Sequence, residues 1–266
     1  PPRRLARVAG HFGEWVQGRI GPDGPVALVT VGCPELYVEA EYRDGPGLTI
    51  SQSPHVFPQT LLQGFLARFG CRTGNVALRS NMPPGGGAGA STATLVALAR
   101  MSGAIVEDVA TACLATEGAT DPLMLTRPDQ VIWSSREART LAQIAPLPEA
   151  EIVGGFWGPP CRTDPGDLNF ADVSDLCEAV NRLGGLRDLA AIATESARRC
   201  VALRGPADDP TEALAKDLGA LGHLRAHTGS ARGLIFSPGT VPDDAFPLLS
   251  EAGVKAPLCF RSGGAA

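Results

Sequence analysis

Residues 83–92 read PPGGGAGAST and join two segments of different pattern. Residues 75–79 before them, NVALR, have the pattern of a strand, and residues 91–101 after them are rich in Ala and Leu as a buried helix is. Glycines let backbone N–H groups approach an anion closely, and a helix N-terminus adds partial positive charge at the same place. Ser91 and Thr92 stand where they can cap the helix or bind a metal ion held by that anion. The stretch therefore predicts a phosphate-binding loop, with a capped Gly-Pro connector as the alternative.

Strand and helix patterns alternate along the rest of the chain. The periodicity predicts strands at 5–9, 26–31, 36–42, 48–51, 75–79, 130–133, 141–144, 152–157, 233–236 and 257–260. It predicts helices at 61–69, 91–101, 106–117, 171–183, 187–203, 210–223 and 243–250. Pro146, Pro148 and the acidic segment 149–151 indicate a boundary, so we expect one domain over 1–148 and a second over 149–266. A β-rich first half followed by mixed elements favours an α+β protein with two lobes.

The composition excludes several classes of protein. The chain has 266 residues, 44% of them apolar, and a net charge of −5, which is typical of a globular protein that buries its own core. An acidic balance argues against a nucleic-acid partner, and no apolar run approaches the roughly 18 residues of a membrane span. The two lysines, Lys216 and Lys255, follow no glycine-rich loop, which excludes the GxxxxGK[ST] phosphate loop. Seven cysteines without a CxxC pair, and an N-terminus without the apolar run of a signal peptide, predict a cytoplasmic protein.

Residues 10–18, GHFGEWVQG, form a second candidate site directly after the first predicted strand. The carboxylate of Glu14 is a hydrogen-bond acceptor, and Gln17 adds an amide. Both groups suit an amino-acid substrate that carries an ammonium, a hydroxyl and a carboxylate. A turn with two surface polar residues is the alternative interpretation.

Two later segments carry further candidate residues. Residues 117–122, EGATDP, place two acids four positions apart where a helix enters a loop. Such a pair can serve one metal–phosphate site, where one group supports the metal ion and another orients or deprotonates the attacking hydroxyl. Residues 227–233, HTGSARG, run into a strand, and their glycines permit close approach of the backbone. The alternatives are a helix end with a Thr-Asp-Pro turn, and a structural histidine.

Together these segments resemble the motifs of the GHMP kinases, the superfamily of galactokinase and of homoserine, mevalonate and phosphomevalonate kinases. The loop 83–92 resembles the family's P-P-x-x-G-L-G-S-S-A-A. Residues 10–18 resemble G-x-x-G-E-x-x-Q-G, a variant typical of the branch with the L-threonine kinases of cobalamin biosynthesis and propanediol utilisation. Residues 117–122 resemble E-P-T-D-S of that branch, and 227–233 resemble its A-H-S/T-G-S/T-x-x-G. The motifs follow the family's order over nearly the whole chain.

The resemblance implies a two-lobed α+β GHMP kinase fold, with an N-terminal lobe similar to domain 2 of ribosomal protein S5 and a ferredoxin-like C-terminal lobe. It implies ATP, bound between the lobes, and Mg²⁺ as cofactors, a small hydroxylated amino acid as partner, and a possible dimer. The implied activity is phosphorylation of L-threonine to O-phospho-L-threonine for cobalamin biosynthesis. The alternatives are a kinase for homoserine or another small alcohol, and a catalytically inert nucleotide-binding protein. An RNA-binding module with the S5-like fold conflicts with the acidic balance.

The resemblance also assigns roles to residues. Asp121 would receive the proton of the substrate hydroxyl, with Glu14 in the catalytic set, and Ser91 and Glu117 would hold Mg²⁺; the roles of the two acids 117 and 121 could be exchanged. The ATP loop comprises Pro84, Gly85, Gly86, Gly87, Ala88, Gly89, Ala90, Ser91 and Thr92. The substrate residues are Glu14, Gln17, His227, Thr228, Gly229 and Ser230. Three positions depart from the family pattern: Gly86 often is Lys in the threonine-kinase branch, Ala90 replaces the first Ser of the loop, and Thr94 often is Asp.

Overall fold

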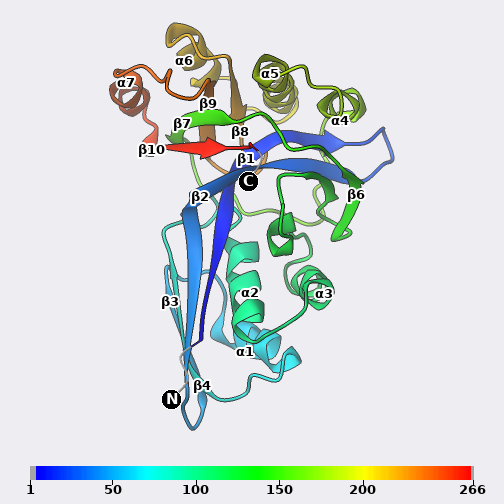
Figure 1. Cartoon of the computed structure of the whole chain (residues 1–266), viewed down its shortest axis with the longest axis vertical. Helices are drawn as coiled ribbons and strands as arrows, with labels where there is room; N and C mark the ends of the chain where they lie inside the picture. The colour runs from blue at the N-terminus through cyan, green and yellow to red at the C-terminus, as the bar shows by residue number, and fades with distance from the viewer. Residues whose placement is uncertain (1–3, 265–266) are drawn as a thin grey trace.

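Two long antiparallel strands, β1 (Arg4–Arg19) and β2 (Val26–Arg43), form the spine of the computed structural model, which describes residues 4–264. The other described strands extend this pair in the order β10-β7-β9-β8-β1-β2-β4-β3, with β5 attached to β2 and β6 to β5. Figure 1 shows the pair running from the narrow lower part of the molecule, near the N-terminus, into its wide upper part. Strands and helices share one structure, so the predicted α+β class is confirmed.

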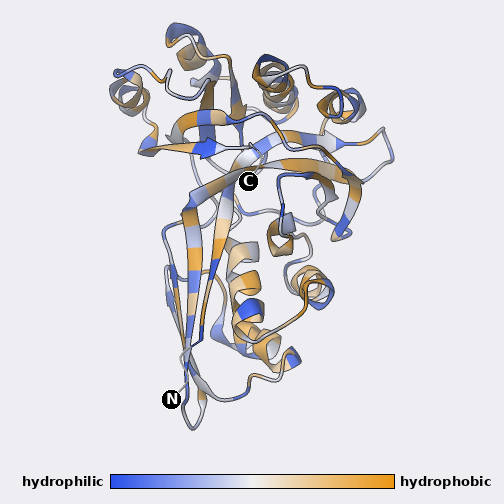
Figure 2. Cartoon of the chain, viewed as in Figure 1, coloured by the Kyte–Doolittle hydropathy of each residue, from blue (hydrophilic) through white to orange (hydrophobic). Residues whose placement is uncertain are grey.

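The N-terminal half surrounds one buried helix. Parallel strands β3 (Leu48–Ser53) and β4 (Gly74–Ser80) are joined through α1 (Gln59–Arg68). The central helix α2 (Ala90–Met101) packs on β1 and β2, and α3 (Val106–Glu117) packs on α2. A short 3₁₀ helix, η1 (Pro122–Met124), and the hairpin β5 (Val131–Ser134) and β6 (Arg139–Gln143) follow. Figure 2 shows apolar residues along α2 and the strands behind it, which is why this predicted helix is buried on nearly every side.

The C-terminal half contains four strands and four helices of the described chain. The strands are β7 (Ala150–Phe156), β8 (Gly222–Arg225), β9 (Ala231–Phe236) and β10 (Lys255–Ser262). The helices are α4 (Ser174–Val180), α5 (Leu186–Arg204), α6 (Thr211–Asp217) and α7 (Ala245–Glu251). The strands lie in the order β10-β7-β9-β8 with every neighbour antiparallel, which is the ferredoxin-like arrangement of a β-α-β-β-α-β unit.

Four predictions of strand and helix boundaries are wrong. The strands predicted separately at 26–31 and 36–42 are one strand, β2. Residues 10–18 do not follow the first strand but belong to β1, which bends there through three register shifts against β2. Such bulges leave residues unpaired and re-aim side chains, so a strand can carry the glycines that a loop would carry. The predicted helix 210–223 ends at Asp217, and the chain then forms β8. The predicted helix 171–183 is the shorter α4.

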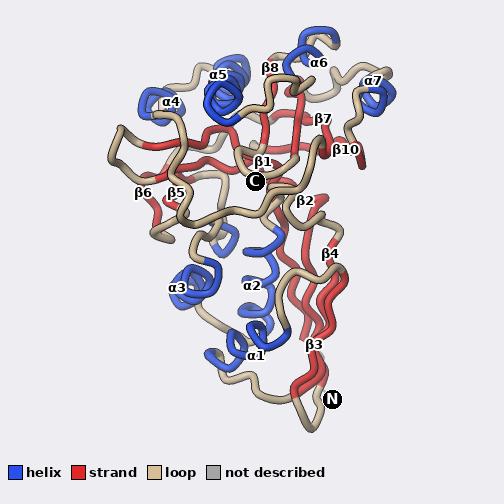
Figure 3. Tube along the Cα trace, turned by 180° about the vertical axis from the view of Figure 1, so that it is seen from behind, coloured by secondary structure: helices blue, strands red, loops and turns tan. Residues whose placement is uncertain are grey.

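The sheet continues through the boundary expected between the two halves. Glu14 of β1 pairs with Arg225 of β8, and Figure 3 shows strands following one another from β3 and β4 into β7 and β10. The division into 1–148 and 149–266 stays a prediction, and residues 1–3 and 265–266 at its ends lie outside the described residues. No helix formed by residues 4–264 is long and apolar enough to cross a bilayer. All seven cysteines are free thiols.

Candidate active site

The bent part of β1 is bonded to the glycine loop, residues 83–89. The backbone N–H of His11 donates to the carbonyl oxygen of Ala88 at 3.0 Å, and that of Gly13 donates to Gly87 O at 3.1 Å. His11 is still opposite Gly32 of β2, but the register shifts between His11 and Glu14, so Gly13 has no partner on β2 and its N–H can bond the loop. Two motifs that lie more than sixty residues apart in the sequence therefore form one surface.

The loop 227–230 is interlocked with the glycine loop from the other side. Gly86 O accepts hydrogen bonds from Ser230 N at 3.1 Å and from Ala231 N at 2.8 Å. Gly87 has a φ of +77°, and a Cβ there would lie 2.3 Å from Ala226 Cβ. Gly229, with a φ of +122°, approaches so closely that a Cβ would lie 2.5 Å from Gly87 N. Glycine is thus required at both contact points.

A cavity of about 240 Å³ opens where these segments meet. Helix α2 begins beside it at Ala90, so the first N–H groups of the helix have no partner within the helix and face an opening. Backbone amides and a helix N-terminus together form an anion-binding site, and a glycine cradle that any Cβ would fill fits the phosphates of ATP. Besides residues 83–92, the cavity is lined by His11, Glu14, Gln17, Glu117, Asp121, Arg136 and Thr228, with Val56 and Phe57 as apolar neighbours.

Glu117 bonds two hydroxyl groups in the first turn of α2. Ser91 Oγ donates to its Oε2 at 2.6 Å, and Thr92 Oγ1 donates to its Oε1 at 2.7 Å. Part of the side chain reaches solvent, but the carboxyl group is enclosed by protein. Burial raises the pKa of Glu117 to about 7, and the nearby charge of Asp121 acts in the same direction. The hydrogen bonds from the two hydroxyl groups act against this rise. Hydroxyl and carboxylate oxygens are donors that suit Mg²⁺, so the pair Ser91 and Glu117 fits this ion.

Asp121 is paired with a histidine that the sequence analysis did not select. His11 Nε2 lies 3.0 Å from Asp121 Oδ2, and the histidine side chain is only 3% exposed. Burial lowers the pKa of His11. The charge and hydrogen bond of Asp121, together with the Glu14 charge and the Gly13 backbone, raise this pKa by more than burial lowers it, so the net pKa lies above the ordinary value. Asp121 is held also through its N–H, which donates to Thr92 Oγ1 at 3.1 Å.

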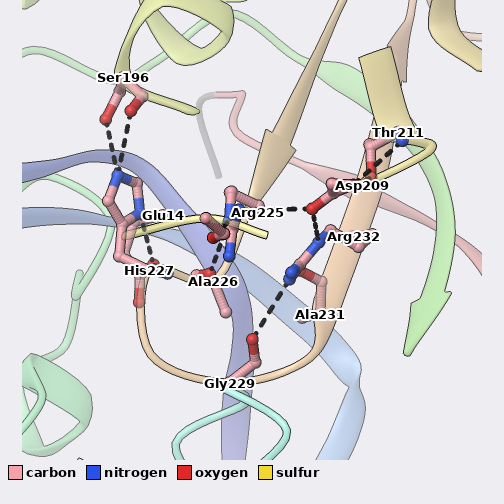
Figure 4. A network of polar contacts seen from close by, with 11 residues as sticks. Glu14, Ser196, Asp209, Thr211, Arg225, Ala226, His227, Gly229, Ala231 and Arg232 are labelled. Carbon is pink, nitrogen blue, oxygen red and sulfur yellow. Dashed lines mark hydrogen bonds and ion pairs between the residues drawn. The ribbon is translucent and has the colours of Figure 1, made fainter. Parts of the chain in front are cut away.

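Glu14 belongs to a buried network that links β1, α5 and the loop 227–230 (Figure 4). His227 N donates to Glu14 Oε2 at 3.3 Å, and His227 Nδ1 lies 3.5 Å from the same oxygen. Ser196 Oγ lies 3.1 Å from His227 Nε2 and accepts a hydrogen bond from Gln17 N at 3.1 Å. Gln17 Oε1 is buried and has no hydrogen-bond partner within residues 4–264.

The predicted substrate residues do not all reach one place. Glu14, Gln17 and Thr228 line the cavity beside the glycine loop. His227 and Gly229 line a second cavity instead, and Ser230 is buried and lines neither. The predicted phosphate, metal and hydroxyl residues, 84–92, 117 and 121, all line the first cavity.

Two of the three departures from the family pattern, Gly86 and Thr94, have local explanations, and nothing in the structure explains Ala90. Gly86 leaves no space for a lysine, because a Cβ would lie 2.9 Å from the Phe156 ring and 3.0 Å from Pro83 O. Thr94 is buried inside α2 and donates to Ala90 O, one turn earlier, at 2.7 Å, so its hydroxyl is satisfied within the helix. The basic side chains that line this cavity come from elsewhere in the chain: His11, Arg136 and Arg162.

No protein-family model and no curated protein matches the sequence. Solved structures match it over nearly its full length. Mevalonate kinase from methicillin-resistant Staphylococcus aureus is 16% identical with a TM-score of 0.65, covering 99% of this chain and 100% of that chain. Phosphomevalonate kinase from Streptococcus pneumoniae is 14% identical with a TM-score of 0.62, covering 99% and 98%. Homoserine kinase from Cytophaga hutchinsonii is 15% identical with a TM-score of 0.51, covering 97% and 94%. The chain therefore has the predicted GHMP kinase fold.

Proposed function

We propose that the chain is an ATP-dependent kinase that phosphorylates the hydroxyl group of a small amino acid, L-threonine in the first place, to give O-phospho-L-threonine for cobalamin biosynthesis. One observation carries this proposal: the pairs Ser91–Glu117 and His11–Asp121 line the same cavity as the glycine loop. A phosphate cradle, oxygen donors for a metal ion and a carboxylate for the hydroxyl proton are the parts that phosphoryl transfer requires.

The glycine loop and the N-terminus of α2 would bind the phosphates of ATP through backbone N–H groups. Val56 and Phe57 offer apolar surface for the adenine ring. Ser91 and Glu117 would hold Mg²⁺, which neutralises phosphate charge when it is bound. The protonated ring of His11 would add positive charge at the loop, because it packs where a Cβ on Gly89 would meet it at 2.7 Å.

Asp121 would receive the proton of the attacking hydroxyl. Its Oδ2 is bonded to His11, and its Oδ1 has no hydrogen-bond partner in the described part of the chain, so Oδ1 can face the hydroxyl. His11 would act as a positioning residue that fixes the rotamer of this carboxylate. Holding the hydroxyl oxygen and the phosphate in one geometry accounts for much of the rate enhancement expected of such an enzyme.

Two oxygen acceptors in the cavity support an acceptor substrate with an ammonium group. Glu14 supplies a buried carboxylate, and Gln17 Oε1 is a buried oxygen without a partner in residues 4–264. A buried polar atom costs free energy unless it is hydrogen-bonded, and the N–H groups of an ammonium would satisfy both oxygens. This feature favours an amino alcohol over an alcohol without nitrogen.

Release of ADP from Mg-ATP tests the proposal with L-threonine, L-serine, L-homoserine and mevalonate as acceptors. We expect kcat/KM for L-threonine to exceed the others by about tenfold or more, since discrimination on this scale needs only 1–2 kcal/mol. Gln17→Leu should raise KM for L-threonine about tenfold and leave KM for ATP unchanged, while Gln143→Leu, on the exposed end of β6, should change neither. Release with mevalonate alone would contradict the amino-acid acceptor, and ATP binding without release for any alcohol would show an inert binder.

A further inference from the structure

The loop 227–229 also borders a second cavity, of about 460 Å³. Three arginines from different elements line this cavity: Arg204 ends α5, Arg225 ends β8, and Arg232 lies in β9. None of them was selected by the sequence analysis, and none lines the cavity beside the glycine loop.

Two of these arginines are held in an arrangement that is unfavourable by itself. Arg225 and Arg232 are directly opposite each other in the antiparallel pair of β8 and β9, where like charges repel. They are 5% and 3% exposed. They share one carboxylate, because Asp209 Oδ2 lies 2.6 Å from Arg232 Nε and 3.3 Å from Arg225 Nη1 (Figure 4). Burial, and then the charge of Arg225, lower the pKa of Arg232 against the attraction of Asp209. Two buried cations thus have one anion between them.

Each of these guanidinium groups leaves an amino group unused. Arg225 donates through Nε to Ala226 O and through Nη1 to Gly205 O, both at 3.2 Å. Arg232 donates through Nε to Asp209 and through Nη1 to Gly229 O and Ala231 O. No described residue accepts a hydrogen bond from Nη2 of either side chain, although both residues line the cavity.

Arg204 adds a third guanidinium, closer to solvent. Its Nη1 donates to Asp167 Oδ2 at 2.7 Å and to Asn169 O at 2.8 Å, and its guanidinium lies over the Phe170 ring. Asp167 also lines the cavity, so its charge is offset by this arginine. Counting Asp167 and Asp209 against three arginines leaves one positive charge in excess.

We propose that the second cavity is a binding site for a carboxylate or phosphate group, held by the Nη2 amino groups of Arg225 and Arg232. Planar guanidinium groups bind such oxyanions through paired N–H donors, and a buried surplus cation is stabilised when an anion completes its pairing. The group could belong to the acceptor substrate, as its own carboxylate, or to a separate small anion. Both sources present the same chemistry to the arginines.

Inorganic phosphate tests the site by calorimetric titration of the full chain in the presence of saturating ADP, so that the glycine loop is occupied. We expect Arg232→Lys to weaken phosphate binding about tenfold or more, because lysine keeps a charge opposite Asp209 but loses the second amino group. Arg261→Lys on the exposed strand β10 is the matched control and should leave binding unchanged. Thermal unfolding of each variant verifies that the fold is retained. Absence of phosphate binding to the wild-type chain, or equal binding to the wild type and Arg232→Lys, would overturn the proposal.

Binding is measured without turnover, so the site can be tested whether or not the chain transfers phosphate. The source of the group is then decided by kinetics, a step that rests on the proposed kinase activity. If phosphate competes with L-threonine and Arg232→Lys raises its KM about tenfold, the site holds the acceptor's carboxylate. If phosphate binds without competing and KM is unchanged, the site holds a separate anion. Both outcomes support the site, and both differ from the loss of activity with every acceptor that would refute the proposed function.

Discussion

Replacing Glu117 by Gln should remove one pH-dependent contribution to the stability of the fold. Burial raises the pKa of this carboxyl group to about 7 in the folded protein, against 4.5 as the ordinary value. Between these two pH values the folded protein holds a proton that the unfolded chain has released. Stability rises with pH where the unfolded state binds more protons, so here it falls as pH rises, and it is lowest above the folded pKa.

The expected magnitude follows from the difference between the two pKa values. A shift of this size corresponds to roughly 3 kcal/mol, since each unit is about 1.4 kcal/mol. Glutamine has the shape of a protonated glutamate, and its amide can accept the Ser91 bond and donate to Thr92 Oγ1. Glu117→Gln should therefore fold, and it should lack this one titration.

Urea denaturation of the ligand-free chain at pH about 5 and about 8.5 measures the effect. Between these two pH values, the free energy of unfolding of the wild-type chain should fall by roughly 3 kcal/mol more than that of Glu117→Gln. Glu149→Gln, which changes an exposed carboxylate paired with Arg261, should behave as the wild type. Parallel pH profiles for the wild type and Glu117→Gln, within about 0.5 kcal/mol, would refute the reasoning.

Three further changes test the site. Asp121→Asn should lower kcat about 100-fold or more and spare ATP affinity, as measured by ADP release and nucleotide titration; activity that survives would remove Asp121 from the proton-accepting role. His11→Gln should lower kcat about tenfold or more. It should also destabilise the protein most below pH 6.5, because a histidine with a raised pKa stabilises the fold there, and this contribution is lost as pH rises through the folded pKa. Equal losses of stability at acid and alkaline pH would contradict this reasoning. Gly87→Val should abolish ATP binding through the overlap with Ala226, whereas Gly47→Val, where no atom lies within 4 Å, should not, and unaltered affinity in both would refute the phosphate cradle.

The parts of the fold set by local pattern could be predicted from the sequence. Helices α2 and α3 begin and end within one residue of the predicted ranges, and Gly89 directly before α2 and Gly118 directly after α3 mark two of these ends. The glycine loop was located by the same local chemistry. Its contacts with residues 10–18 and 227–230 bring together three motifs that lie far apart in the sequence.

The long strand β1 could not be predicted to its full length. Gly10, Gly13 and Gly18 suggest a loop, and only pairing with β2 and β8 shows that bulges accommodate them. Strand β8 was missed for a related reason: it has four residues, and its extended backbone is decided by pairing with β9. Tertiary pairing thus overrides local propensity at both places.

The residues missed at the site are those whose role depends on distant partners. His11 stands in a glycine motif, and a single histidine in a sequence does not indicate a role. Its role is suggested only by the structure, which places Asp121 Oδ2 3.0 Å from its Nε2. Its place beside Gly10 in that motif was the available signal. Arg225 and Arg232 are separated by six residues in the sequence, and the pairing of β8 with β9 brings them face to face.

Because β1 pairs with β8, the nascent chain cannot complete this part of the sheet until most of it has been synthesised. Glu14 and His227 are 213 positions apart, so at ordinary synthesis rates of about 5–20 residues per second, β1 waits roughly 10–40 s for its partner. During that time the β1 edge of this hairpin lacks its pairing with β8, and an unpaired strand edge is the kind of surface that associates with other chains. We expect the emerging chain to depend on chaperones, and slower translation of its second half to lower the yield of folded protein.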